Sequence, residues 1–540
     1  MRWWDWLMGI AGLAAVLTGL WALENGRAGL AIEETRLGDT PASIVRAAGG
    51  ETAGIVVIAH GFAGSRKLME PFAFTLGRAG YLVVSFDFIG HGEHPTQLPA
   101  RIEGEGGAAA VLIDQLGEVV TAARGIAGDP GAPYALLGHS MATDLLARAV
   151  AEGLTPQATV AVSLFSPEVT ATNPPNMLIV TGGWEDGLTD EALRVVGLTK
   201  DYLDRDPAGE AVTPSPVGVG VGVGETVGRF EDATARRAIF PDGVEHIGVL
   251  YDPVSLQAAR AWLDRAFDRP QALADGGIPA EPASVEVRGP LLAAVFFGMI
   301  ALARPLSFAL PRLGNGVGAA AGWWRLALLA VVPGVLTPLI VTQLPSGLMP
   351  IILGDYLAKH FLAYGLITWM ALWWAAGRGW VALPDRAALA PLARPALIAA
   401  LAVGLWTLAA FTVALERYAF SFVPTPGRAV LIPIFVVAFL PWFLADEWLT
   451  RGGTATGARA GAYALTKVMF VISLGIAVAI DPPRLFFLLI IAPVMLVFFA
   501  VYGVLSHWAM QRTGHPWAAG AGIAVALAWS VAVSFPLFGA

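Results

Sequence analysis

The strongest constraint in this sequence is a series of apolar stretches, each close to the length of about 20 residues that a helix needs to cross a bilayer. One stretch runs from about Leu7 to Leu23. Eight more follow in the C-terminal half, at residues 290–309, 324–343, 355–377, 395–415, 429–446, 462–480, 485–506 and 517–539. With 56% hydrophobic and 14% charged residues, the chain is neither wholly water-soluble nor disordered. The sequence therefore predicts an all-α membrane domain of about eight transmembrane helices over residues 290–540.

The N-terminal apolar stretch has the features of a retained anchor. Arg2 precedes it, the stretch is long for the core of a signal peptide, and no clean small-x-small cleavage site stands before Glu24. We therefore expect residues 1–24 to form an N-terminal transmembrane signal anchor. A cleaved signal peptide is the alternative.

Charge divides the chain into two blocks. Residues 24–288 hold 35 acidic and 19 basic residues, whereas residues 289–540 hold 6 acidic and 14 basic residues. The formal net charge of −8 argues against nucleic acid as a partner. Because the chain has no cysteine, disulfides, thiolate nucleophiles and cysteine metal ligands are excluded.

Residues 25–270 have the pattern of an α/β domain. Short apolar runs are expected as strands at Gly54–Ala59, Tyr81–Phe86, Tyr134–Leu137, Ala158–Leu164, Met177–Thr181 and Ala235–Phe240. Amphipathic stretches are expected as helices near residues 66–79, 107–126, 141–153, 190–204 and 253–267. Because the apolar runs do not alternate with polar residues, helices should cover both faces of a mostly parallel sheet. Residues 29–45 are expected to add an antiparallel hairpin at its edge.

Two segments of biased composition interrupt this pattern. Residues 271–289 are rich in Pro, Gly and Ala and are expected to link the two domains. Residues 207–228 contain alternating Val and Gly. That alternation predicts either a flexible hairpin or flap, or a low-complexity surface loop.

The pattern Gly138-His139-Ser140-Met141-Ala142 lies between a predicted strand and a predicted helix. A serine in this context stands on a tight turn, which lifts its hydroxyl above the carboxyl edge of the sheet. The residues two positions before and two positions after it must be small, as Gly138 and Ala142 are. We predict that Ser140 is a nucleophile.

Two backbone amides are candidates for an oxyanion hole. The Met141 amide starts the helix after Ser140 and can face a negative charge that develops there. Upstream, His60-Gly61-Phe62 follows a predicted strand, and a turn there would bring the Phe62 amide toward Ser140. An ordinary glycine turn at the strand end is the alternative for this second motif.

A base and an acid are expected in two later loops of the same sheet edge. His246 follows the last predicted strand, and Asp186 follows the strand before it, with the adjacent Glu185 as the alternative acid. The chain order of serine, acid and histidine is the one expected for this architecture. His91 and His94 could be metal ligands, but they lack a matching cluster of carboxylates and histidines, so we assign them a loop role.

Residues from about Gly54 to Phe267 resemble the α/β-hydrolase superfamily, in its lipase/esterase, dienelactone-hydrolase and serine-aminopeptidase-like branches. The matching residues are His60-Gly61-Phe62, Asp87 with Gly90-His91-Gly92, Gly138 to Ala142, Gly183 to Asp186, and His246. The resemblance implies an eight-stranded, mostly parallel sheet and a triad of Ser140, His246 and Asp186. The chain departs from the family in Ala142, where the family has glycine, and in a long insertion between acid and histidine.

These residues imply a membrane-bound serine hydrolase that cleaves carboxylic esters through an acyl-enzyme on Ser140, with no cofactor and no metal. A lipid or a small acyl ester is the expected substrate, and membrane lipids are expected partners. An acyltransferase with the same triad is one alternative. A lipid transporter or sensor with a secondary hydrolase-like domain is another.

The distribution of Lys and Arg predicts the orientation of the spans. With Arg2 inside, the first span exports the acidic block and the later spans alternate. The inner ends then carry ten basic residues, namely Arg304, Arg312, Arg325, Arg378, Arg386, Arg394, Arg451, Arg459, Lys467 and Arg512. The outer ends carry four, namely Lys359, Arg417, Arg428 and Arg484. We therefore expect an integral protein of a bacterial inner membrane, with the hydrolase domain outside the cytoplasm.

Polar residues in or near the predicted spans are Asp355, His360, Glu416, Asp446, Glu447 and Asp481. Buried acids would mark a substrate or proton path in a transporter. Nearly all of these residues fall at predicted span ends. We therefore expect solvated positions at the membrane interface.

Overall fold

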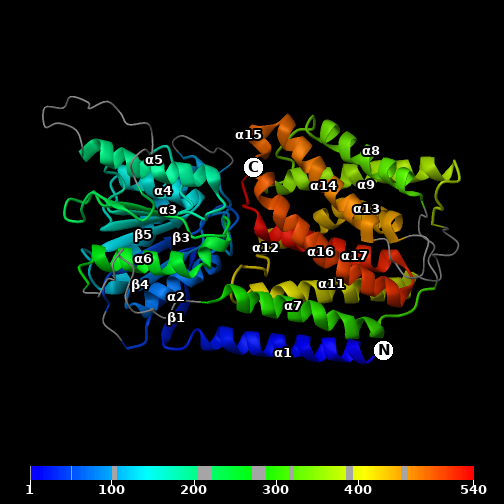
Figure 1. Cartoon of the computed structure of the whole chain (residues 1–540), viewed down its shortest axis with the longest axis horizontal. Helices are drawn as coiled ribbons and strands as arrows, with labels where there is room; N and C mark the ends of the chain where they lie inside the picture. The colour runs from blue at the N-terminus through cyan, green and yellow to red at the C-terminus, as the bar shows by residue number, and fades with distance from the viewer. Residues whose placement is uncertain are drawn as a thin grey trace.

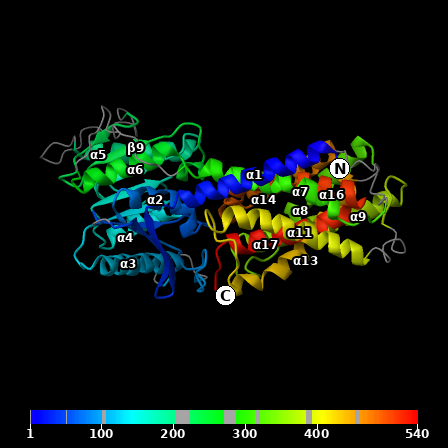
Figure 2. The same ribbon diagram turned by 90° about the horizontal axis from the view of Figure 1, so that it is seen from below.

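In the computed structural model, an α/β domain and a helical domain lie end to end and form an elongated molecule (Figure 1, Figure 2). The structure describes residues 2–49, 52–99, 106–203, 222–269, 287–314, 321–384, 393–451 and 460–539. Most of the expected linker and most of the Val–Gly segment lie outside these described residues.

The α/β domain is built on a nine-stranded sheet in the order β1-β2-β4-β3-β5-β6-β7-β9-β8. Its strands are β1 (Leu30–Leu37), β2 (Thr40–Ala47), β3 (Ile55–Ala59), β4 (Leu82–Phe86), β5 (Tyr134–His139), β6 (Ala158–Val162), β7 (Met177–Val180), β8 (Thr226–Val227) and β9 (Arg236–Ile239). The six strands from β4 to β9 in this order are parallel, and β2 and β8 pair antiparallel at the two sides. The predicted parallel sheet and edge hairpin are confirmed, with one strand more than the resemblance implied.

Helices cover both faces of this sheet. The helices are α2 (Glu70–Arg78), α3 (Ala108–Ala127), α4 (Met141–Ala151), α5 (Asp186–Leu203) and α6 (Pro253–Ala266), with the short turns η1 (Arg66–Met69) and η2 (Gly248–Leu250). Along β3, Val56 and Ile58 pack on the side of α2 and α6, while Ile55 and Val57 pack on the side of α3 and α4. Because both faces are buried, the strands need apolar residues at every position. All parallel strands end at one edge, where their loops gather.

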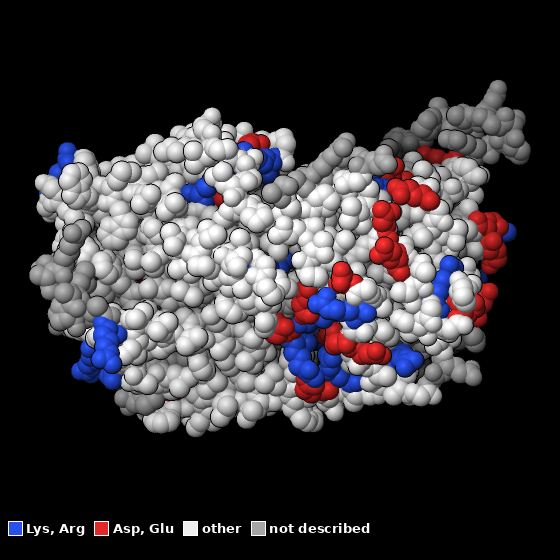
Figure 3. Space-filling view, turned by 180° about the vertical axis from the view of Figure 1, so that it is seen from behind, with Lys and Arg blue, Asp and Glu red and all other residues white. Residues whose placement is uncertain are grey.

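The helical domain contains a long helix at each of the nine predicted spans. These are α1 (Trp3–Asn25), α7 (Gly289–Leu306), α8 (Trp323–Val341), α9 (Gly354–Ala376), α11 (Ala393–Leu415), α13 (Ile432–Arg451), α14 (Ala460–Ile480), α16 (Leu488–Thr513) and α17 (Pro516–Ser534), with the short α12 (Pro426–Ala429), α15 (Pro482–Leu485) and η3 (Ser307–Ala309). Among the described residues, eight helices are long and apolar enough to cross a membrane, and α9 is the predicted span that falls outside that set. Figure 3 shows a broad uncharged belt over this domain. The chain is an integral membrane protein.

Helix α1 packs along α7 as part of the bundle (Figure 2). A Cβ atom on Gly12 would lie 2.8 Å from the carbonyl oxygen of Gly298, and one on Gly298 would lie 2.7 Å from that of Gly12. Two glycines therefore let the two backbones approach closely, as small residues do between membrane helices. Near the N-terminal end of α1, Asp5 accepts a hydrogen bond of 2.8 Å from Nε of Arg304.

Asp446, Glu447, Arg451 and Lys467 are charged residues that lie inside the bundle. Asp446 pairs with Lys467, and Glu447 pairs with Arg451 at 3.3 Å. All four are 2–4% exposed. The expectation of solvated positions is therefore wrong for Asp446 and Glu447, because α13 continues to Arg451 and packs against α14.

Of the other polar residues of the predicted spans, Asp355 and His360 are buried, whereas Glu416 and Asp481 are partly exposed. Asp355 is 7% exposed and pairs with Lys359 at 2.7 Å, and His360 is fully buried, so the expectation is also wrong for these two. Glu416 and Asp481 do lie at helix ends, with side chains 25% and 30% exposed.

The two domains meet at the carboxyl edge of the sheet. The loop after β4 packs on the C-terminal segment of the chain, where the carbonyl of Gly90 accepts a 2.9 Å hydrogen bond from the Leu537 amide. The same carbonyl accepts a 2.9 Å hydrogen bond from the buried guanidinium of Arg428. Leu98 and Phe538 form a parallel bridge. Through these contacts, the loops at the carboxyl edge of the sheet face the membrane domain.

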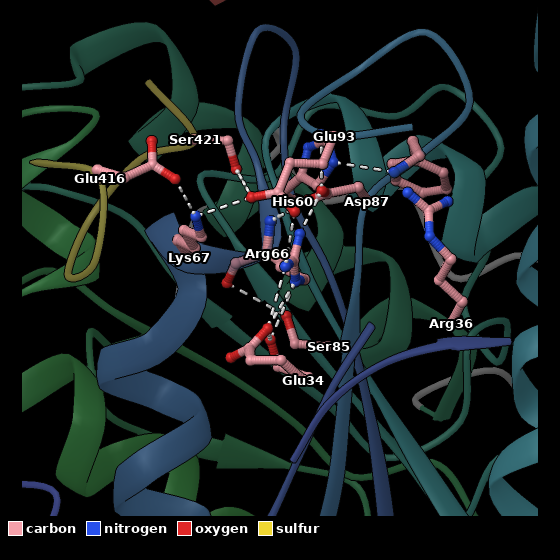
Figure 4. A network of polar contacts seen from close by, with 12 residues as sticks. Glu34, Arg36, His60, Arg66, Lys67, Ser85, Asp87, Glu93, Glu416 and Ser421 are labelled. Carbon is pink, nitrogen blue, oxygen red and sulfur yellow. Dashed lines mark hydrogen bonds and ion pairs between the residues drawn. The ribbon is translucent and has the colours of Figure 1, made fainter. Parts of the chain in front are cut away.

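An ionic network spans the same junction (Figure 4). Lys67 lies 2.8 Å from both Glu93 of the α/β domain and Glu416 of the membrane domain. Arg66 pairs with Asp87 at 2.6 Å and with Glu93 at 3.1 Å. Burial alone would raise the pKa of Glu93, but the charges of Arg66 and Lys67 outweigh it and lower the pKa to about 2. Glu93 is thus held as a carboxylate between the two domains.

Candidate active site

Ser140 lies on a sharp turn between β5 and α4. Its φ of 53° and ψ of −119° are strained for a residue with a side chain. A Cβ atom on Gly138 would lie 2.8 Å from Leu146 Cδ1 and 3.2 Å from Ala142 Cβ, which shows why a small residue is needed there. Ala142 is accommodated as well. The turn places the Ser140 side chain at the N-terminus of α4, as the motif predicted.

His246 lies between Ser140 and a carboxylate. Its Nε2 atom is 2.9 Å from Ser140 Oγ, and its Nδ1 atom is 2.5 Å from Glu185 Oε1. When the ring carries its hydrogen on Nδ1, that N–H donates to the carboxylate and Nε2 accepts from the serine hydroxyl. The three side chains are brought together from loops after β5, β7 and β9.

The structure brings Glu185, the alternative acid, to His246 and leaves the predicted Asp186 exposed. The sequence predicts a helix from about residue 190, but α5 starts at Asp186, and this aspartate is exposed. A carboxylate in the first turn of a helix is stabilised by the helix dipole. Glu185 is the last residue of the loop before α5, and its side chain extends toward His246.

Two further donors hold the Glu185 carboxylate. The Gly182 amide and the Ser163 hydroxyl each donate to Oε2 at 2.8 Å. Ser163 directly follows β6, is fully buried and has a φ of 54°. With Oε2 fixed, Oε1 points at the imidazole. The sequence analysis missed Ser163, since a lone serine after a strand carries no distinguishing signal.

The loop after β3 passes directly beside the nucleophile. A Cβ atom on Gly61 would lie 3.0 Å from Ser140 Cβ and 2.9 Å from His139 Nδ1, so only glycine fits there. Phe62 follows Gly61 directly, and Met141 is the first residue of α4. Both candidate oxyanion amides therefore lie on backbone segments next to Ser140.

Buried histidines brace the loops around this site. His60 accepts a 3.1 Å hydrogen bond from the Phe88 amide at Nε2, which ties the loop after β3 to the one after β4. His139 donates from Nε2 to the carbonyl oxygen of His246 at 3.0 Å. Burial lowers the pKa of His60 and lowers that of His139 well below the usual range. Both rings are therefore neutral at pH 7, as His60 must be to accept a hydrogen bond at Nε2.

His91 and His94 lie in the loop after β4. His91 Nδ1 is 3.0 Å from the Ile89 carbonyl oxygen, and His94 Nδ1 accepts a 3.1 Å hydrogen bond from the Thr96 amide. Both rings therefore stabilise their own loop. Within the described residues, no group of three or more His, Asp and Glu side chains could hold a metal ion.

Comparisons with known proteins locate the α/β domain in a fold family. Residues 50–208 match the sequence model of the family described as Serine aminopeptidase, S33. Among solved structures, TT1662 from Thermus thermophilus is similar, with 14% identity over 45% of this chain and 99% of that chain and a TM-score of 0.29. A dienelactone hydrolase from Anabaena variabilis shares 17% identity over 44% of this chain and 98% of that chain, with a TM-score of 0.27. A membrane phospholipase A, a bacterial virulence factor, shares 14% identity over 47% and 92%, with a TM-score of 0.28.

No curated protein matches the chain. The family match includes Ser140 and Glu185, and the described sheet extends the same domain to His246. The elbow, the sheet order and the family match agree on one fold. The chain therefore carries a domain with the α/β-hydrolase fold, similar over residues 50–208 to the serine aminopeptidase family, joined to a helical membrane domain.

Proposed function

We propose that this protein is a membrane-bound serine hydrolase that cleaves carboxylic esters through an acyl-enzyme on Ser140. The observation that carries the proposal is the alignment of Ser140, His246 and Glu185, with both ring nitrogens of His246 in hydrogen-bond contact. An aligned nucleophile, base and carboxylate is the arrangement that activates a serine hydroxyl.

In the first half of the reaction, Ser140 Oγ attacks the ester carbonyl and His246 Nε2 takes the hydroxyl proton. Glu185 stabilises the imidazolium and keeps the ring oriented. The tetrahedral intermediate then collapses, the carbon–oxygen bond to the alcohol breaks, and His246 protonates the departing alcohol. Water, deprotonated by the same histidine, releases the carboxylic acid from Ser140.

The amides of Phe62 and Met141 are the proposed oxyanion donors. The support for Phe62 is the contact distance at Gly61, which brings that loop against Ser140. The support for Met141 is its place at the start of α4, where amides have no partner within the helix. Backbone donors fixed by the fold need no reorganisation as charge develops on the oxygen.

The hydrolase domain is proposed to lie outside the cytoplasm. The N-terminus lies at the end of the bundle away from this domain and the C-terminus lies at the domain junction, which fits an odd number of crossings (Figure 1). Arg451, Lys467 and Arg428 are buried rather than in loops. Without them, the ten inner and four outer basic residues become eight and three, still in the sense of the positive-inside rule.

Alkaline phosphatase fused after residue 275 tests this orientation, because the enzyme is active only outside the cytoplasm. We expect an active fusion. An inactive fusion, with an active cytoplasmic reporter at the same site, would reverse the orientation.

The anchor is proposed to remain attached. Its support is the close packing of Gly12 on Gly298 and the pairing of Glu24 with Arg417 at 2.5 Å, which join α1 to the bundle at two places.

Hydrolysis of acyl esters by the purified full-length protein tests the proposed activity. We expect the wild-type protein to hydrolyse esters of 4-nitrophenol, and Ser140→Ala to lose several orders of magnitude in kcat. Equal rates for the two proteins, with both folded by size-exclusion chromatography, would reject the proposal.

A further inference from the structure

The membrane domain touches the loop that borders the nucleophile. The ring of Phe62 stacks on that of Phe487, with 4.9 Å between centroids and 26° between planes. Phe487 lies between α15 and α16, at the end of the bundle that faces the hydrolase domain. Gly61 lies in the same loop as Phe62 and packs against Ser140. One short loop therefore contacts both the nucleophile and the membrane domain.

Exposed apolar side chains surround this contact on the membrane domain. Phe486, Phe487 and Leu489 are 55%, 43% and 48% exposed. They lie at and just after the junction of α15 and α16, at the end of the bundle that faces the hydrolase domain. The ends of membrane-spanning helices are where the hydrocarbon core of a bilayer gives way to the headgroups. Lipids carry the ester bonds of their acyl chains at this boundary. A lipid beside these residues would hold its ester at the level of the junction.

A second set of exposed apolar side chains flanks the triad on the hydrolase domain. Phe165, Trp184 and Ile247 are 67%, 70% and 37% exposed. Trp184 and Ile247 are the chain neighbours of Glu185 and His246, and Phe165 lies in the loop after β6. These loops belong to the sheet edge that faces the membrane domain. Large exposed apolar groups beside a reactive centre mark a surface for an apolar ligand.

Resting on the proposed function, we propose that the substrate is a long-chain acyl ester dissolved in the bilayer, which reaches Ser140 sideways with its acyl chain lying across Phe487. The attack of Ser140 Oγ forms the serine ester and breaks the bond to the lipid alcohol, which leaves with the proton from His246. Water then releases the fatty acid. Phe487 of the membrane domain and Trp184 of the hydrolase domain are specificity-determining residues, because both contact the acyl chain of the substrate.

The experiment compares a long and a short ester on one enzyme. Full-length protein in phosphatidylcholine liposomes hydrolyses 4-nitrophenyl palmitate, which partitions into the bilayer, and 4-nitrophenyl butyrate, which stays in water. We expect Phe487→Ala to lower the ratio of long-chain to short-chain kcat/KM about tenfold, because apolar contacts discriminate by about this factor. The loss should appear in KM for palmitate.

Each variant has a control at another exposed aromatic residue of the same domain. Phe297 is 60% exposed on α7, and Tyr202 is 47% exposed at the end of α5 opposite to Trp184. Phe297→Ala and Tyr202→Ala should keep the wild-type ratio. Trp184→Ala alters the other domain and should lower the ratio as well, which keeps the proposal testable if Phe487→Ala does not fold.

An unchanged ratio in Trp184→Ala and in a folded Phe487→Ala would overturn the inference. Equal losses on both esters would also overturn it, since they would assign these residues to support of the loops. Failure of the proposed function looks different, because wild-type protein would then hydrolyse neither ester.

Discussion

The residues at the sheet edge and the charged residues inside the bundle are both tied by dense hydrogen bonds, but water reaches only the first group. The His246 side chain is 23% exposed, and its ring joins a hydroxyl to a carboxylate. Asp446, Glu447, Arg451 and Lys467 are 2–4% exposed and form two complete ion pairs.

This difference separates a site from a support. Each of these four charges already has an opposite charge beside it, and Glu447 also accepts a 2.6 Å hydrogen bond from Ser506. Such a cluster stabilises one packing of the helices, because an unpaired charge inside a bilayer is costly. At the sheet edge, the Glu185 carboxylate is fixed by its own hydrogen bonds, and the Ser140–His246 pair stays accessible to water. Access and alignment, rather than burial of charge, identify the reactive group.

The largest expected effect tests the acid of the triad. Glu185→Gln should lower kcat by about 10⁴-fold, because an amide does not stabilise the imidazolium and favours the wrong tautomer. The matched control is Asp186→Asn, one residue along the chain, which should stay within about twofold. Esterase kinetics check both, and the reverse pattern would return the role to Asp186.

The next effect tests the bundle cluster as a support. Lys467→Met leaves Asp446 unpaired and should reduce the free energy of unfolding by about 3–5 kcal/mol. The double variant Lys467→Met with Asp446→Leu should recover much of it. Thermal unfolding in detergent measures both. A single variant as stable as wild type would show that the pair does not hold the helices together.

A smaller effect tests the place of α1 in the bundle. Gly12→Ala puts a methyl group against a backbone oxygen of α7 and should destabilise the protein by about 1–3 kcal/mol. Gly475, on α14, has open space around the position of a Cβ atom, so Gly475→Ala is the matched control. Equal melting temperatures for the two variants would contradict the close packing.

The smallest effect tests the ionic network at the junction. The folded protein lowers the pKa of Glu93 from 4.5 to about 2, so its stabilisation is present above about pH 4.5 and is lost as pH falls toward 2. Glu93→Gln should therefore flatten the fall of the melting temperature between pH 5 and pH 3, measured as about two degrees less loss. Parallel curves for variant and wild type would remove Glu93 from the network.

The parts of the site that follow from local chain order were predictable from the sequence. The elbow at Ser140 and the late His246 depend on residues close to a strand end. The choice between Glu185 and Asp186 was not predictable from the sequence. It depends on where α5 begins and on Ser163, which follows another strand and donates a hydrogen bond to Glu185. Glu185 ends the loop before α5 and is directed at His246, whereas Asp186 begins the helix and is exposed.

The spans were predictable because length and apolarity suffice for a membrane helix. The pairing of Asp446 with Lys467 was not, because a hydropathy pattern does not show which neighbours cover a span end. The stacking of Phe62 on Phe487 joins residues from two domains, and no local pattern marks it. Contacts of this kind arise only when the whole chain is packed.

The most direct test of the central claim maps the nucleophile. Membranes holding the full-length protein are treated with a fluorophosphonate, and the modified peptide is identified by mass spectrometry. We predict one adduct, on Ser140, that disappears in Ser140→Ala and slows strongly in Glu185→Gln. An adduct on another serine, or undiminished labelling of Ser140→Ala, would contradict the account.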